Sequence, residues 1–446
     1  MAKKVFPLGF WNYAKMGTIG ENPVKDWVEA GMNLVLSPHF DYTKNDKQEM
    51  LDLLDECQKN GVQMIIDDPR TGWFEASTNP EAYRARFQTL LDDYGTHPAV
   101  YGYYVGDEPR ADQMADALAA VKLQREMAPD KVPFINFNPY WDGNEKVLNG
   151  MSFDEWIDDF VQKSGLQQLS YDRYSQMNPP DATESGIHEY YQSLRYFMDA
   201  AKRNNVPLWV SNLSVGHFRY RCPREDDFRW QLNTTVACGA KCVWWFFFYM
   251  RLCRINYRVA PIDEHGERTE TYRWLSRVQR TFQHQFGSLF MHLEHDETYM
   301  VGHAYGGYPI LEYKRHPLVN QVTCDHNLPA LVSFFHMEDG TKYMALVNNS
   351  QTESGFFRTY FSPKAKNIYR VTYSFVGKPV DGMVASSGAG GIPVGDHSYL
   401  NMPYGGYEVN IARNDVCNGY RLDENGVTHN GAWLAPGQME VFRIEE

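Results

Sequence analysis

Strand-like apolar runs alternate with helical patterns through the first two thirds of the chain. The runs begin near residues 5, 33, 62, 100, 132, 166, 206 and 241, and each precedes a stretch with apolar residues three or four positions apart. Eight such units in about 290 residues predict an α/β fold, the closed (β/α)8 (TIM) barrel. The alternative is an open doubly wound sheet. Its glycine-rich nucleotide turn is missing after the first strand, which runs into Gly9-Phe-Trp-Asn-Tyr13.

Helix start signals support this division. Asn45-Asp46 and Asn79-Pro80 each precede an amphipathic stretch, and Ser152 with Glu155 has the spacing of a capping box. We therefore expect helices to begin at these three positions.

The helical period disappears after about Leu293. Short alternating runs such as Tyr343-Met-Ala-Leu-Val follow, separated by turns such as Asp339-Gly. This pattern predicts an antiparallel β-sandwich. We expect a barrel domain over residues 1–293 and a β-sandwich domain over residues 294–446.

Composition and charge narrow the possible partners. The formal net charge is −13, which argues against binding to a nucleic acid backbone. No apolar run is long enough to span a membrane. The seven cysteines contain no CxxC pair, so neither a disulfide framework nor a zinc cluster is expected. Met-Ala-Lys-Lys leads straight into the first strand, which fits a cytoplasmic protein or an exported one whose signal has been removed.

The fourth predicted strand carries the strongest chemical signal. Val100-Tyr-Gly-Tyr-Tyr-Val-Gly-Asp-Glu-Pro109 is a buried strand that ends in two adjacent carboxylates, Asp107 and Glu108. In a (β/α)8 barrel the active site lies at the carboxyl ends of the strands. The alternative is a structural role in which Asp107 caps the helix after Pro109.

The other strand ends add polar and aromatic side chains to the same rim. Carboxylates and amides suit sugar hydroxyls, and aromatic faces cover the apolar face of a sugar ring. We expect substrate-binding roles for Asp107, Trp11, His39, Asp67, Asp68, Asn138, Trp141, Tyr174, Trp209 and Trp245. Trp244 and Trp245 point to opposite faces of one strand, so at most one of them is expected to reach the pocket.

The layout and the fourth-strand motif resemble the (β/α)8-barrel glycoside hydrolases of clan A. In that clan the fourth strand ends in Asn-Glu-Pro or a variant of it, and the Glu is the general acid/base. The resemblance implies this role for Glu108, with Asp107 at the position where Asn is commoner. It covers nearly the whole chain in layout, and only this motif is specific to a catalytic role.

The seventh strand departs from the clan's pattern. The clan has its nucleophile, a second Glu, at the end of this strand, where the sequence here reads Trp209-Val-Ser-Asn-Leu-Ser214. We expect Asp172, at the end of the sixth strand, to be the second catalytic carboxylate. The alternative is that it only pairs with Arg173 or a neighbouring Arg, or only binds a sugar hydroxyl. Asp68 and Glu264 are the next candidates. Because strands four and six are not adjacent, room for a water molecule and an inverting mechanism are expected.

The sequence therefore predicts a glycosidase that cleaves an oligo- or polysaccharide without a cofactor or metal. One alternative is a carbohydrate-binding or degenerate barrel that lacks hydrolysis. The other is a metal-dependent barrel enzyme with Asp67, Asp107, Asp172 and His39 as ligands, although no HxH pair is present. The sequence predicts no particular oligomeric state.

Overall fold

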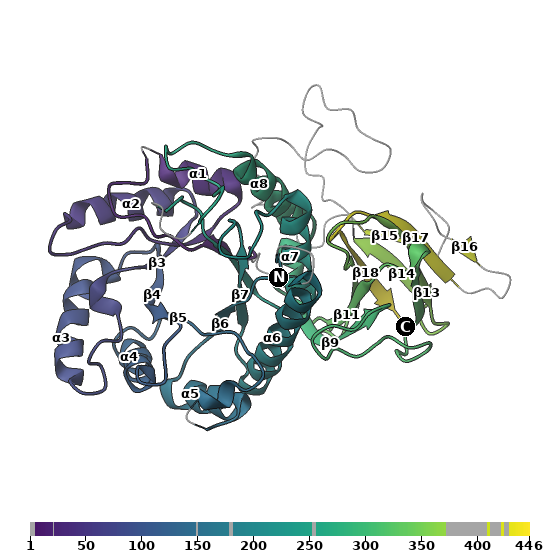
Figure 1. Ribbon diagram of the computed structural model, residues 1–446, viewed down its shortest axis with the longest axis horizontal. Helices are drawn as coiled ribbons and strands as arrows, with labels where there is room; N and C mark the ends of the chain where they lie inside the picture. The colour runs from purple at the N-terminus through teal and green to yellow at the C-terminus, as the bar shows by residue number, and fades with distance from the viewer. Residues whose placement is uncertain are drawn as a thin grey trace. The chain divides into compact units, whose positions relative to one another are not determined.

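The computed structural model describes residues 5–20, 22–148, 150–177, 182–251, 256–371, 408–410, 421–422 and 428–446 (Figure 1). The chain divides into two compact units. One unit comprises Pro7–Pro223 and Cys242–Arg273 and contains all the strands of the barrel. The other comprises Met1–Phe6, Arg224–Lys241 and Trp274–Glu446 and contains the antiparallel sheets.

The parallel strands of the first unit form a closed barrel. They pair in the orders β1-β8-β7-β6 and β2-β3-β4-β5. Two backbone hydrogen bonds join these halves, from Asn33 to Leu8 at 2.9 Å and from Phe137 to Ser170 at 2.8 Å. The strands are β1 (Leu8–Phe10), β2 (Leu34–Leu36), β3 (Gln63–Ile66), β4 (Val100–Asp107), β5 (Val132–Asn136), β6 (Leu169–Asp172), β7 (Leu208–Leu213) and β8 (Cys242–Phe246). The predicted (β/α)8 barrel is confirmed.

Helices alternate with these strands along the chain, and the predicted start signals are confirmed. Asp46 caps its helix by accepting a hydrogen bond from the Gln48 N–H at 3.0 Å, and Ser152 and Glu155 form the capping box. The helices are α1 (Pro23–Ala30), α2 (Lys47–Lys59), α3 (Pro80–Leu90), α4 (Met114–Met127), α5 (Phe153–Ser164), α6 (Ala182–Asn204), α7 (Glu225–Ala237), α8 (Glu270–Phe282) and α9 (Ser288–Phe290). None of the helices in the described ranges is long and apolar enough to cross a membrane.

Aromatic side chains fill the interior of the barrel. The ring of Phe134 stacks on Trp244 with 4.9 Å between centroids, and Trp209 stacks on the same indole at 6.4 Å. Trp11 contacts Trp244 from β1. The interior is therefore a packed core rather than an open channel.

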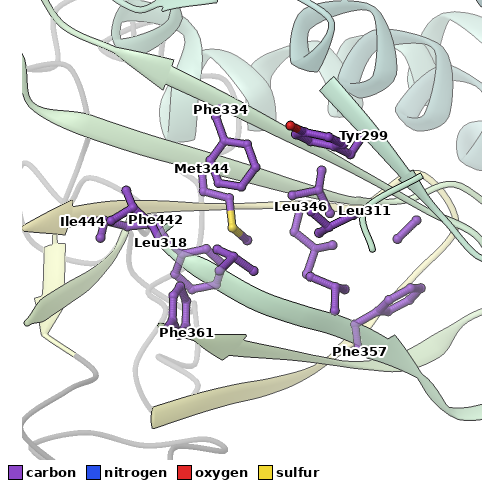
Figure 2. Packing of buried hydrophobic residues seen from close by; sticks show 14 of the residues in the cluster. Tyr299, Leu311, Leu318, Phe334, Met344, Leu346, Phe357, Phe361, Phe442 and Ile444 are labelled. Atoms are coloured by element: carbon purple, nitrogen blue, oxygen red, sulfur yellow. The ribbon is translucent and has the colours of Figure 1, made fainter. Parts of the chain in front are cut away.

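The second unit contains two antiparallel sheets packed face to face. The sheets have the orders β10-β13-β17-β16 and β15-β14-β18-β12-β11-β9. Their strands are β9 (Glu294–Val301), β10 (Val319–Cys324), β11 (Ala330–His336), β12 (Lys342–Asn348), β13 (Gly355–Phe361), β14 (Asn367–Val371), β15 (Glu408–Asn410), β16 (Arg421–Leu422), β17 (Thr428–Leu434) and β18 (Met439–Glu445). Figure 2 shows Phe357 and Phe361 of one sheet facing Met344, Leu346 and Phe442 of the other. The predicted β-sandwich is confirmed.

Helix α7 packs on the sandwich within this unit. The indole N–H of Trp230 donates to the carbonyl and side-chain oxygens of Asn349, at 3.1 and 3.0 Å. The Asn233 side chain donates to the Gly437 carbonyl at 2.8 Å. A Cβ at Gly437 would lie 2.2 Å from the Trp230 Cα, so only glycine permits this approach. The seventh helix of the series thus depends on the C-terminal sheets for its packing.

We predict that residues 1–293 alone are not a stable fragment, because truncation leaves the apolar face of α7 without the sheet that covers it. Expression of this fragment should give insoluble or non-cooperatively unfolding material. The domain boundary at residue 293 remains a prediction, and a soluble, fully active fragment would refute the dependence.

In the full chain, Trp230→Ala should lower the free energy of unfolding by about 3–5 kcal/mol, because it removes a fully buried indole. Denaturant unfolding measures this change. The matched control is Trp433→Ala, at a tryptophan of the same unit that is 64% exposed, and it should change stability by less than about 0.5 kcal/mol. Equal effects of the two substitutions would contradict the packing role of Trp230.

Candidate active site

The end of β4 has an irregular backbone that presents two carboxylates at the barrel mouth. Its register against β5 shifts between Tyr104 and Gly106, as in a β-bulge. Gly106 has φ +153°, and a Cβ there would lie 2.0 Å from the Trp73 ring. Glu108 has φ +46°, a value uncommon for a residue with a side chain. Such strain is concentrated at functional sites, and here it accompanies Asp107 and Glu108.

Asn136, at the end of β5, connects two carboxylates from the strands on either side of it, β4 and β6. Its amide nitrogen donates to Asp107 Oδ1 at 3.1 Å and to Asp172 Oδ1 at 2.8 Å. The Ser170 hydroxyl donates to Asn136 Oδ1 at 2.9 Å and fixes the direction of the amide. Both carboxylate oxygens accept a hydrogen bond from the same nitrogen, Asn136 Nδ2. The distance between Asp107 Oδ1 and Asp172 Oδ1 therefore cannot exceed the sum of the two hydrogen-bond lengths, about 6 Å.

Desolvation, together with this proximity, raises the pKa values of the mouth carboxyls. Surrounding protein desolvates Asp107, and the charges of Asp172 and Glu108 add to the effect, raising its pKa to about 8. Desolvation and the charge of Asp172 raise the pKa of Glu108 to about 7. Desolvation also raises the pKa of Asp172, although hydrogen bonds from Asn136 and Tyr174 oppose the rise. The group therefore retains protons at neutral pH.

The two residues of the β4 pair differ in their contacts. Asp107 accepts the hydrogen bond from Asn136. The Glu108 backbone N–H donates to the Asn136 carbonyl at 2.8 Å, whereas its carboxyl group has no hydrogen-bond partner among the described residues. Both side chains are accessible to solvent. Glu108 is thus a mouth carboxyl that is free to bond a ligand.

Tyrosines surround the carboxylates. The buried Tyr174 hydroxyl donates to Asp172. Desolvation, followed by the charge of Asp107, raises the pKa of Tyr13 well above its ordinary value. The Arg251 guanidinium lies over the Tyr13 ring, 4.0 Å from the centroid. These phenols remain neutral and provide hydrogen-bond donors around the carboxylates.

Two of the predicted acids have partners of their own. Asp67 pairs with His39 at 3.1 Å, and this hydrogen bond raises the pKa of His39. Asp68 caps the short 3₁₀ helix η1 (Pro69–Thr71) and forms a buried ion pair with Arg70 at 2.7 Å. The Asp68 carboxylate is therefore engaged within the protein, and we leave it out of the proposed substrate site.

The predicted tryptophans occupy two different environments. Trp11, Trp209 and Trp245 are buried, and the Trp11 N–H donates to Ser211 at 2.9 Å. No face of these three rings is open to a sugar, so we leave them out of the proposed site as well. Trp141, by contrast, is 38% exposed.

Two cavities of the first unit are lined by residues that follow the barrel strands. One, of about 480 Å³, is lined by Asn138 and Trp141 together with residues that directly follow Glu108. The other, of about 850 Å³, is lined by Tyr13, Arg251 and Glu264 among others. Glu264, the reserve candidate for the second carboxylate, is exposed on the wall of this second cavity.

The proposed metal ligands do not form a recognisable metal site. Across the described ranges, no group of three or more His, Cys, Asp or Glu side chains has an arrangement that could hold a metal ion.

Asn136 and Tyr13 are not among the site residues predicted from the sequence, although both stand at predicted strand ends. Asn136 is the first polar residue after Val132-Pro-Phe-Ile135. The signal that would find it is the register of β5 against β4, in which Asp107 is opposite Asn136. That register includes the bulge, which no sequence period reveals.

No protein-family model and no curated protein sequence matches the chain. Solved structures with a similar arrangement include a β-galactosidase from the psychrophilic Marinomonas ef1, at 13% identity and a TM-score of 0.48, covering 62% of this chain and 59% of that one. A β-galactosidase from Halorubrum lacusprofundi matches at 14% identity and a TM-score of 0.47, covering 63% and 58%. A β-glucosidase from Thermotoga maritima matches at 12% identity and a TM-score of 0.42, covering 62% and 98%.

These structural neighbours are glycoside hydrolases, and the matches cover less than two thirds of the two β-galactosidase chains. The activities belong to those proteins. The fold of this chain rests on its own strand order and register.

We predict that Asp107→Asn stabilises the protein at alkaline pH. With a folded pKa of about 8, Asp107 holds its proton in the native state while the unfolded chain has lost it. The native state then binds more protons than the unfolded state, so this group's contribution to stability falls as the pH rises from about 4 to about 8. The amide lacks this titration and still offers an oxygen to Asn136.

Thermal unfolding should give a Tm about 1–2 °C above wild type at pH 8, and a smaller difference at pH 5. Glu338→Gln, at an exposed acid of the other unit, is the control, and its Tm should differ from that of wild type by the same amount at both pH values. If Asp107→Asn instead lowers the Tm by the same amount at both pH values, the raised pKa of Asp107 in the folded protein would be contradicted.

Proposed function

We propose that this protein hydrolyses glycosidic bonds, with Glu108 as the general acid/base. The observation that supports the proposal most strongly is the group of mouth carboxyls whose pKa values are raised into the neutral range, to about 8 for Asp107 and about 7 for Glu108. Glycoside hydrolysis requires one protonated carboxyl and one ionised carboxylate near the same bond. The combination is typical of catalytic sites, where acids are tuned toward the working pH.

Glu108 suits the acid step because its carboxyl group is accessible and unbonded. In the proposed step its proton moves to the glycosidic oxygen as the bond from that oxygen to the anomeric carbon breaks. The leaving group departs as an alcohol, and Glu108 becomes a carboxylate. The energetic requirement is that Glu108 holds a proton near pH 7, which its raised pKa provides.

Asp172 is the proposed second carboxylate. Asn136 and the Tyr174 hydroxyl both donate to it, and these bonds favour its ionised form against desolvation. As a general base it would take a proton from a water molecule that attacks the anomeric carbon. Inverting enzymes place the two carboxyls about 6.5–9.5 Å apart to admit this water. This assignment predicts a product of inverted configuration.

A second assignment of roles within the same activity follows from Asn136. Asp107 and Asp172 both accept hydrogen bonds from its amide nitrogen, which limits the distance between their two oxygens to about 6 Å. Retaining enzymes hold their two carboxyls about 5–5.5 Å apart, with one acting as the nucleophile. If Asp107 and Asp172 are the reacting pair, the configuration is retained, so the stereochemistry of the product separates the two assignments.

The alternative function is carbohydrate binding without hydrolysis. It is favoured by the end of β7, where Ser211 and Asn212 stand instead of a carboxylate and Ser211 is bonded to Trp11. Hydrolysis and binding measured on the same sugars distinguish the two functions.

Glu108→Gln should lower turnover on a cleaved glycoside by at least about a hundredfold, the usual contribution of general acid catalysis. The glutamine fills the same space but carries no acidic proton, so thermal unfolding should remain near wild type. Glu81→Gln, at an exposed acid of helix α3, is the control and should retain full activity. Turnover near wild type in Glu108→Gln would remove the assignment.

The pH dependence provides an independent test. Activity that needs the protonated form of Glu108 should fall as the pH rises through about 7, its folded pKa. The falling limb of kcat/KM should therefore have its midpoint near that value. Unchanged kcat/KM up to pH 9 would contradict the role of a protonated Glu108.

Asp172→Asn should abolish hydrolysis under either assignment, because both use this carboxylate. Proton NMR of the first-formed anomer from the wild-type enzyme should show inversion if Glu108 and Asp172 react as a pair. Retention would transfer the acid role to Asp107, and full activity of Asp172→Asn would exclude both assignments.

A further inference from the structure

Strands β5 and β6 meet at a seam of the barrel. They belong to different four-stranded sheets and are joined by an isolated bridge between Phe137 and Tyr171. Asp107, in β4, belongs to one of these sheets, and Asp172, in β6, belongs to the other. The separation of these two carboxyls therefore depends on what holds the seam together.

Buried side chains form hydrogen bonds across this seam. Where the two strands begin, the Gln168 side chain donates to the Pro133 carbonyl at 2.8 Å. Near the mouth, the Ser170 hydroxyl donates to Asn136 Oδ1 at 2.9 Å, and Asn136 Nδ2 donates to Asp172 Oδ1 at 2.8 Å. Because Ser170 and Asp172 are two positions apart on β6, they lie on the same face of the strand. Asn136 of β5 thus bonds two successive residues of that face.

The polar atoms of the Asn136 side chain are all engaged within the protein. Its amide nitrogen carries two hydrogens, and Asp107 and Asp172 each accept one hydrogen bond from it. Its oxygen accepts the bond from Ser170. Asn136 and Ser170 are each only 1% exposed. Any effect of these two residues on a substrate at the mouth is therefore indirect.

The Ser170 hydroxyl supports the orientation of this amide. Without it, Asn136 Oδ1 would be a buried acceptor with no donor among the described residues, which is unfavourable. The last side-chain torsion of asparagine has a broad energy minimum, so the amide can rotate. Rotation would move the N–H groups away from the two carboxyls and weaken bonds that favour their ionised forms.

We propose that Ser170 is a positioning residue, which acts through Asn136 to hold Asp107 and Asp172 at a fixed separation across the seam, with a hydrogen-bond donor between them. The consequence for catalysis rests on the proposed function, in which Asp172 must be ionised under either assignment of roles. Ser170 itself contacts neither a substrate nor a reacting atom.

Other charged and titratable groups also act on this pair of carboxyls. The Arg173 guanidinium forms an ion pair with Glu189 of α6, and the Tyr174 hydroxyl donates to Asp172. The charge of Glu108 acts on Asp107. The phenols in electrostatic reach of the pair are those of Tyr13, Tyr104 and Tyr220. A substitution at Ser170 leaves all these groups in place, so a changed titration of the pair reports on the bonds from Asn136.

The first test is a ¹³C NMR titration of the side-chain carboxyls in the full-length protein. In Ser170→Ala the apparent pKa values of Asp107 and Asp172 should rise by at least about half a unit, because the bonds to their ionised forms weaken. Ser170→Thr retains a hydroxyl and should titrate as wild type does. The control is Ser193→Ala, at a buried serine of α6 that donates to the Tyr140 carbonyl at 3.1 Å, and it should cause no shift. An unchanged titration in Ser170→Ala would overturn the proposal.

A double-mutant cycle with Asn136→Leu tests whether the effect passes through Asn136. Ser170→Ala should shift the titration of the pair in the wild-type background and add no shift in the Asn136→Leu background. Equal shifts in the two backgrounds would show that Ser170 acts without Asn136 and would overturn the proposal. If Asn136→Leu does not fold, Ser170→Thr and Ser170→Ala decide between them, since equal shifts in these two variants would exclude a role of the hydroxyl.

The titration needs no substrate, so this proposal and the proposed function can fail separately. On a cleaved glycoside, Ser170→Ala should move the rising limb of the pH profile of kcat to higher pH and leave KM near wild type. A shifted titration without cleavage of any glycoside would support the role of Ser170 and remove the activity. Cleavage with an unchanged titration would support the activity and remove the role of Ser170.

Discussion

The hydrogen bonds from Asn136 to Asp107 and Asp172 are the interaction on which the candidate site depends. They hold two carboxyls of different strands within about 6 Å, where both are difficult to ionise together. The adjacent Glu108 adds a third carboxyl to the same mouth. Desolvation at the mouth is the largest cause of the raised pKa values of Asp107 and Glu108, and this crowding adds to it. The proposed acid catalysis depends on the proton that these two effects retain near neutrality.

The backbone at the end of β4 makes the crowding possible. A regular strand would alternate its side chains between the barrel interior and the helices. The bulge between Tyr104 and Gly106 changes this alternation and places Asp107 opposite Asn136. It also requires a glycine against Trp73 and a left-handed conformation at Glu108. The site thus combines backbone strain with charge repulsion, and the packed aromatic interior below it provides the rigid support.

Much of the fold could be predicted from the sequence because it depends on periodicity and on local start signals. The caps at Asp46 and Ser152 need only a few neighbouring residues, and the change from helical to alternating pattern near Leu293 is visible along the chain. The packing of α7 on the sandwich could not be predicted, since it requires the pairing of Trp230 with Asn349, 119 residues away.

The strand-end pattern predicts where a site would lie, but it gives the composition of that site only in part. Placement at a strand end identified Asp107, Glu108 and Asp172, because parallel strands bring their carboxyl ends to one rim. The same rule could not separate Asp67, which pairs with His39, from Asp68, which forms a buried ion pair with Arg70. The rule also could not predict how deeply each side chain is buried: Trp11 and Trp209 are buried, whereas Trp141 is accessible. Asn136 could be identified as a site residue only from the register of β4 against β5.

The mouth carboxyls of β4 should hold protons at neutral pH. A ¹³C NMR titration of the side-chain carboxyls, assigned through Asp107→Asn and Glu108→Gln, measures their protonation directly. The signals of Asp107 and Glu108 should titrate with apparent pKa values of about 8 and about 7. Titration of both signals near pH 4, the range of ordinary carboxyl groups, would contradict it.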